Sequence, residues 1–60
     1  MRHIIRLSRG EKDYYVGSGK TYVSWNSNVN YARGFVDKSD ARETLREVRE
    51  INTGRIKIEK

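Results

Sequence analysis

The stretch that decides the fold is residues 39–54, SDARETLREVREINTG. Its apolar spacing places one set of side chains on a single helical stripe: Ala41, Leu45, Val48 and Asn52, with Ile51 beside them. Ser39 is a good N-cap because its hydroxyl can accept a free backbone N–H, and Asp40 suits the positive end of the helix. Gly54 is a plausible residue just beyond the C-terminus. The pattern predicts an amphipathic helix of about three turns.

Before this helix the sequence reads as three short strands. Residues 3–7, 13–16 and 21–25 are rich in β-branched and aromatic side chains. Residues 8–11 and 17–20 contain glycine and polar side chains and predict tight turns. Two short turns between three strands indicate an antiparallel meander.

Two further segments complete the chain. Val29, Ala32 and Phe35 recur at spacings of three, which suggests one loose helical turn that Gly34 interrupts. Residues 55–59, RIKIE, alternate strictly between polar and apolar, as a half-buried strand should. The expected order is strand, strand, strand, helix, strand. This predicts an α+β fold, with a mainly antiparallel sheet of three or four strands and one helix packed on one face.

The two-residue period of a strand assigns side chains to the two sheet faces. The face expected to meet the helix carries Ile5, Leu7, Tyr14, Val16, Val23, Trp25, Ile56 and Ile58. The opposite face is expected to carry Arg2, Ile4, Arg6, Tyr15, Tyr22, Ser24, Arg55 and Lys57. Trp25 is therefore expected in the core.

Length and composition favour one small domain over residues 1–60. There is no cysteine, so disulfides and thiolate metal sites are excluded. No apolar run is long enough for a spanning helix or a signal peptide, so we expect no membrane partner and a cytoplasmic location.

The formal charge of +5 is unevenly spread. Residues 1–39 carry seven Lys/Arg against three Asp/Glu, whereas residues 40–51 carry three against four. The basic excess therefore lies outside the predicted helix, and a basic balance favours polyanionic partners.

No motif predicts an enzyme, a cofactor or a metal site. Residues 17–21, GSGKT, lack the earlier glycine of a phosphate-binding loop and precede a strand rather than a helix. His3 is the single histidine and has no partner at an informative spacing. Both features are better explained as a hairpin turn and a surface histidine.

Charged side chains form two stripes on the predicted helix. The acidic stripe holds Glu43, Glu47 and Glu50, and the neighbouring arginine stripe holds Arg42, Arg46 and Arg49. Three guanidinium groups on one edge can follow a phosphate backbone. The acidic neighbours favour instead a solvated face, with pairs such as Glu43 with Arg46.

The sheet face away from the helix is the predicted binding site. Exposed tyrosines among basic side chains suit single-stranded nucleic acid, because rings stack on bases while Lys and Arg neutralise phosphates. The same residue types anchor protein partners. An ordinary sheet surface with cross-strand pairs is the third interpretation.

Part of the sequence is similar in style to short bacteriophage and prophage proteins. The resemblance covers residues 25–45 and rests on Trp25, on Val29, Ala32 and Phe35, and on Ser39-Asp40-Ala41 with Leu45. It implies a phage-type accessory protein that works in the cytoplasm of a host cell.

A second resemblance covers more of the chain. Three strands followed by residues 34–41, GFVDKSDA, and a helix resemble the arm-type DNA-binding domain of tyrosine-family integrases. That resemblance implies that the sheet enters the DNA major groove. The residues nearest DNA would then be Tyr15, Lys20, Tyr22 and Ser24.

The sequence thus predicts a protein without enzymatic activity that binds nucleic acid. The predicted site residues are Arg2, Arg6, Tyr15, Lys20, Tyr22, Ser24, Arg55 and Lys57. The alternative is a small inhibitor or adaptor that binds a host protein, including one that handles nucleic acid. A homodimer formed through an edge strand such as residues 55–59 is a third hypothesis.

Overall fold

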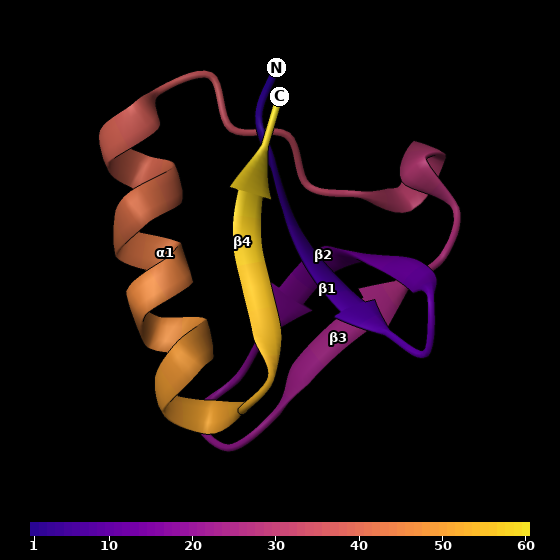
Figure 1. Ribbon diagram of the computed structural model, residues 1–60. Coiled ribbons are helices and arrows are strands. Elements are labelled where there is room, and N and C mark those ends of the chain that lie inside the picture. The colour runs from indigo at the N-terminus through magenta and orange to yellow at the C-terminus, as the bar shows by residue number, and fades with distance from the viewer.

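The computed structural model describes residues 1–60 as a four-stranded antiparallel sheet with one α-helix beside it (Figure 1). The elements are β1 (His3–Ser8), β2 (Glu11–Ser18), β3 (Val23–Asn26), the single 3-10 turn η1 (Val29–Tyr31), α1 (Lys38–Ile51) and β4 (Arg55–Glu59). The spatial order is β3-β2-β1-β4, so β3 and β4 are the two edges. The predicted α+β class and the order of its elements are confirmed. No helix has the length and apolar character that a membrane crossing requires.

The hairpin between β1 and β2 turns on two residues with left-handed backbones. Arg9 has φ 53° and Gly10 has φ 79°, between the paired residues Ser8 and Glu11. Positive φ at both central residues matches the right-handed twist of the flanking strands, and asparagine followed by glycine is the favoured pair there. An arginine at the first position is therefore a source of local strain.

The pairing of β1 with β2 extends from the turn only as far as Ile5 and Tyr14, and β2 carries a bulge between Tyr15 and Gly17 in its pairing with β3. Where the β1–β2 pairing ends, the backbone of Phe35 pairs with Arg2, the residue just before β1, and the Arg33 N–H donates to the Tyr15 carbonyl at 2.9 Å. The segment after η1 therefore fills the gap between β1 and β2 with backbone hydrogen bonds. These bonds pair backbone groups of Arg2 and Tyr15 that the end of the β1–β2 pairing would otherwise leave without partners.

The core lies between the sheet and α1. Its buried residues come from β1, β2, β4, α1 and the segment before α1: Ile4, Tyr15, Phe35, Ala41, Val48 and Ile56, with Val23, Trp25, Leu45 and Ile58 packed against them. The predicted contributions of Val23, Trp25, Ile56 and Ile58 are confirmed. The prediction that Ile5, Leu7, Tyr14 and Val16 face the helix is wrong.

The physical reason for this error is that apolar residues stand side by side in both strands. Ile4 and Ile5 stand next to each other in β1 and Tyr14 and Tyr15 in β2, so alternation alone does not say which residue of each pair faces the helix. In the structure Ile4 and Tyr15 face it. Ile5 lies on the opposite face, opposite Tyr14 and Lys57 on the neighbouring strands.

A side chain caps the N-terminus of the helix, and another side chain ties its C-terminus to the sheet. Asp37, and not the predicted Ser39, is the N-cap: its Oδ1 accepts from the Ser39 N–H at 3.0 Å and from the Ser39 hydroxyl at 2.9 Å. These hydrogen bonds, the backbone one first, hold the pKa of Asp37 below its ordinary value. At the other end Asn52 accepts from the indole N–H of Trp25 at 3.1 Å, which ties the end of α1 to the edge strand β3.

Two segment boundaries also differ from the predictions. The third strand begins at Val23 because the Gly19 N–H donates to the Tyr22 carbonyl and draws residues 21 and 22 into the turn. The helical turn expected over residues 29–35 is confined to η1, where Asn28 caps Asn30. Phe35 is nevertheless buried, as the spacing implies.

The strained turn generates a stability prediction. Replacing Arg9 with asparagine should raise the free energy of unfolding by up to about 1 kcal/mol, because asparagine tolerates the left-handed backbone better than arginine. The measurement is urea unfolding followed by tryptophan fluorescence. Arg9→Gln removes the same charge without that backbone preference and serves as the control, so an equal gain in both variants would contradict the strain argument.

The Asp37 cap generates a pH prediction. Because the folded pKa of Asp37 lies below its ordinary value of 3.8, its stabilising contribution is present above that value and is lost as the pH falls through the folded pKa. Asp37→Asn keeps a capping oxygen but does not titrate. Thermal unfolding between about pH 5 and pH 2 should therefore show a shallower loss of stability in Asp37→Asn than in the wild type. Identical slopes would show that the cap contributes nothing to acid unfolding.

Candidate nucleic-acid interface

The predicted sheet-face site does not form one surface. Tyr15 is only 2% exposed and lies in the core, with its ring 6.2 Å from those of Trp25 and Phe35. Arg6 also lies on the helix side, where it pairs with Asp13 at 3.2 Å and covers the Trp25 ring at 4.7 Å. These two predicted contact residues are structural, because the register places them on the other side of the sheet.

The other predicted site residues are dispersed. Arg2 is held by its backbone pairing with Phe35 and reaches the Val36 carbonyl at 3.4 Å. Lys20 and Tyr22 stand in the turn before β3. Three exposed side chains remain on the face away from α1, at both edges of the sheet: Ser24 on β3, and Arg55 and Lys57 on β4.

An ion pair lies on the sheet face away from α1, between these two edges. Lys12 of β2 donates to Glu59 of β4 at 2.7 Å, so the contact crosses over the intervening strand β1. This hydrogen bond raises the pKa of Lys12. His3 packs edge-on against Tyr14 with ring centroids 5.8 Å apart. The middle of this face therefore offers less free positive charge than its sequence suggests.

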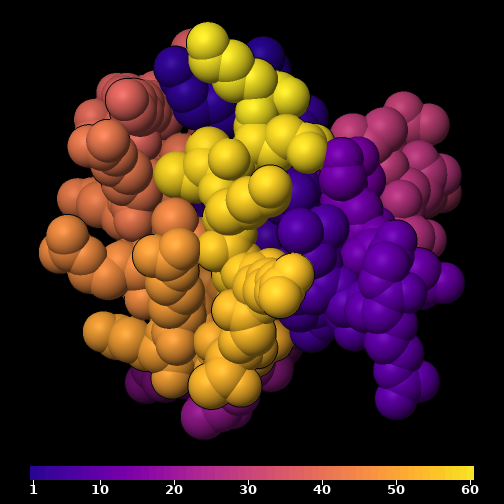
Figure 2. Space-filling view, in the orientation of Figure 1, coloured from indigo at the N-terminus to yellow at the C-terminus, as the bar shows by residue number.

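A cluster of positive side chains lies instead between α1 and β4. A groove of about 510 Å³, here called the basic groove, is lined by Arg42, Leu45, Arg46, Arg49, Glu50 and Ile58. All three members of the arginine stripe line it, against one carboxylate. Figure 2 shows the side chains of α1, in orange, meeting those of β4, in yellow, along this face of the molecule.

The ion pairs expected along the helix are absent. Both salt bridges of the molecule lie in the sheet, and neither the Glu43–Arg46 nor the Arg46–Glu50 pair forms. Arg49 donates to the Ile56 carbonyl at 2.9 Å, which anchors one guanidinium against β4. The side chains of Arg42 and Arg46 make neither a hydrogen bond nor a salt bridge within the protein.

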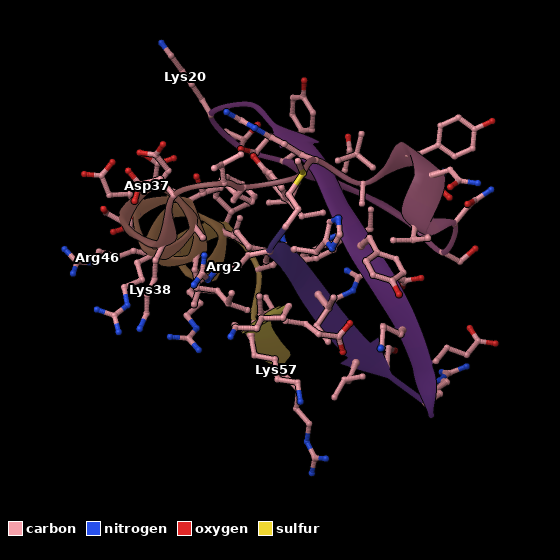
Figure 3. The ribbon with its side chains drawn as sticks, turned by 90° about the horizontal axis from the view of Figure 1, so that it is seen from above. Arg2, Lys20, Asp37, Lys38, Arg46 and Lys57 are labelled. Carbon is pink, nitrogen blue, oxygen red and sulfur yellow. The ribbon has the colours of Figure 1, made fainter.

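Acidic side chains are concentrated on the other flank of α1. A second hollow, of about 450 Å³, is bordered by three carboxylates, those of Asp37, Asp40 and Glu43, and by one cation, Arg33. Seen from above, Asp37 lies on one side of the helix, whereas Lys38, Arg46, Arg2 and Lys57 lie on the other (Figure 3). The prediction that Glu43, Glu47 and Glu50 neutralise the arginine stripe therefore fails for Glu43, while Glu50 does border the basic groove.

The spacing of the arginines in the sequence already indicates part of this groove. Arginines at i, i+4 and i+7 are visible in the spacing, but the acidic residues interleaved with them conceal which side each stripe faces. The contribution of Ile58 from β4 required the strand order, which the sequence did not provide.

No protein-family model, curated protein or solved structure matches this chain. No group of three or more His, Cys, Asp or Glu side chains is placed to hold a metal ion. The functional argument therefore depends on the geometry and charge of the basic groove.

Because Tyr15 is buried and Tyr22 is exposed, truncating the two side chains should affect stability differently. Tyr15→Ala should lower the free energy of unfolding by about 3–5 kcal/mol, as expected for loss of a buried aromatic ring. Tyr22→Ala should change it by less than about 0.5 kcal/mol, because an exposed side chain away from the core contributes little. Chemical denaturation of both variants is the measurement. Similar stability of the two variants would contradict the assignment of Tyr15 to the core.

Proposed function

We propose that this protein binds nucleic acid through the basic groove between α1 and β4, not through the sheet face that the sequence indicates. The supporting observation is that three arginines line one groove with a single carboxylate, and that two of them, Arg42 and Arg46, have no partner within the protein. A free guanidinium presents a fork of N–H donors that matches the oxygens of a phosphate.

The spacing of the arginine stripe suits a phosphate chain. Seven helical residues separate Arg42 from Arg49, which corresponds to a rise of about 10 Å. Successive phosphates of one strand in a duplex advance by about 3.4 Å along the axis, so this rise covers roughly three nucleotides. The stripe therefore engages a short stretch of backbone without bending it.

The surrounding charge strengthens the same surface. Lys38 begins the helix four residues before Arg42 and lies, like Arg46, on the side of α1 away from Asp37 (Figure 3). The net charge of +5 and the placement of Asp37, Asp40 and Glu43 on the other flank give the molecule a basic and an acidic side. Such a distribution orients an approaching polyanion towards the basic groove.

The setting that we propose follows from the resemblance to short phage proteins. An accessory protein of this kind would act in the host cytoplasm and needs no enzymatic activity of its own. Docking here differs from that implied by the integrase resemblance, because the proposed contacts come from α1 and β4 and not from the first three strands.

A protein partner is a second candidate function, because several large apolar side chains are exposed. Met1 is 76% and Val36 80% exposed, and they flank the backbone pairing of Arg2 with Phe35. Tyr22 and Tyr31 are also mostly exposed. These side chains suit the alternative of a small inhibitor or adaptor that binds a host protein. A complex held mainly by them would tolerate added salt, unlike a complex with nucleic acid.

The proposal predicts a local effect of charge. Arg46→Gln should weaken oligonucleotide binding several-fold and reduce the slope of log affinity against log salt by up to about 0.7–0.9, the value of one lost phosphate contact. The measurement is fluorescence anisotropy between about 50 and 200 mM salt.

Lys20→Gln is the matched control, because it removes one positive charge from a side chain that lies apart from Arg46 and Lys57 (Figure 3). It should leave affinity and slope nearly unchanged. Equal losses in both variants would indicate attraction by net charge alone. No binding by the wild type near physiological salt would overturn the proposed function.

A further inference from the structure

The basic groove differs from a plain phosphate-binding strip because its floor is apolar. We infer that it holds an unpaired base of a single-stranded nucleic acid, with the arginine stripe on the adjoining phosphates. This inference rests on the proposed function and specifies its ligand. A strip that bound phosphates alone would need only charged side chains on a flat or convex surface.

The floor is formed by Leu45 of α1 and Ile58 of β4. Both side chains pack against the core and yet still line the groove, so each is only half-buried. The volume of about 510 Å³ falls within the range of about 300–1,000 Å³ that is usual for small-ligand pockets. A base has flat apolar faces and a polar rim, and it suits an aliphatic floor bordered by guanidinium groups, on which bases also stack.

The backbone of β4 supplies hydrogen-bonding groups beside this floor. β4 is an edge strand, paired only with β1, so every second residue directs its N–H and C=O away from the sheet. The Ile56 carbonyl is one of these outward groups, because it accepts from Arg49. Because the strand repeats every two residues, the N–H and C=O of Ile58 point to the same side as those of Ile56. They are placed to bond the rim of a base above the floor.

A duplex cannot use this floor. Its bases are paired on their edges and stacked on their faces, so only the outer phosphates would reach the arginine stripe. Sequence-tolerant binders of single strands combine a basic groove with surfaces that accept bases, and both parts are present here. An acidic peptide would satisfy the charge of the groove but would have no ring to place against Leu45 and Ile58.

The test compares several ligands on the unmodified protein, with the intact and the abasic single strands matched in charge. Labelled single strands of about 12 nucleotides, the same length with abasic sites throughout, a duplex of the same sequence, and polyglutamate are titrated by fluorescence anisotropy. We expect the intact strand to bind roughly tenfold more tightly than the abasic strand and the duplex at the same salt.

A variant of the floor gives a second measurement. Leu45→Gln keeps the side-chain size and helix propensity but makes the floor polar. It should weaken the intact strand several-fold without changing the affinity for the abasic strand or the salt slope. Val36→Gln, the same kind of change at an exposed position outside the basic groove, should alter neither. Far-UV circular dichroism checks that both variants fold.

The outcomes distinguish the two levels of the argument. Equal, salt-dependent affinity for intact and abasic strands would overturn the base site and leave the proposed function in place. Polyglutamate binding as tightly as the intact strand would also overturn it, in favour of an acidic peptide. Absence of binding to every nucleic acid near physiological salt would remove both the base site and the proposed function.

Discussion

The burial of one ring, that of Tyr15, is the constraint on which the rest of the structure depends. This ring lies between Trp25 of β3 and Phe35 of the segment after η1, and its hydroxyl forms a hydrogen bond with that of Ser18 at 2.9 Å. With Tyr15 directed inward, strand alternation directs Ile4 inward and Ile5 outward on the neighbouring strand. The two faces of the sheet, and the charges that each presents, follow from this choice.

Much of the fold could be predicted from the sequence, but the face on which some strand residues lie could not. The strict alternation of β4 and the stripe of Ala41, Leu45 and Val48 in α1 specify their elements unambiguously, because each pattern fits one period only. The pairs Ile4–Ile5 and Tyr14–Tyr15 fit either face of a strand. A non-local contact, the pairing of Phe35 with Arg2, accompanies the inward choice, and such a contact has no local signature.

The lack of a local signature for non-local contacts also explains why the candidate site lies elsewhere than the sequence predicts. Charge patterns in the sequence give the sign of each side chain but not its partner. Lys12 and Glu59 are 47 positions apart, and their ion pair exists because β1 brings β2 and β4 to its two sides. Arg6 likewise has partners within the protein: it forms an ion pair with Asp13 and lies over the ring of Trp25. Arg42 and Arg46 stay without such partners, and the groove that they line also contains the apolar side chains of Leu45 and Ile58.

The strand order also has a kinetic consequence. The first strand in the chain lies beside the last, with His3 opposite Glu59, so almost the whole polypeptide forms the loop that this pairing closes (Figure 1). Such distant contacts slow folding, because chain entropy is lost before they form. The strands β1, β2 and β3 are neighbours in the chain as well as in the sheet, so their pairing closes only short loops. The floor that Ile58 contributes does not exist until β4 has docked, so formation of the groove waits for the most distant pairing of the chain.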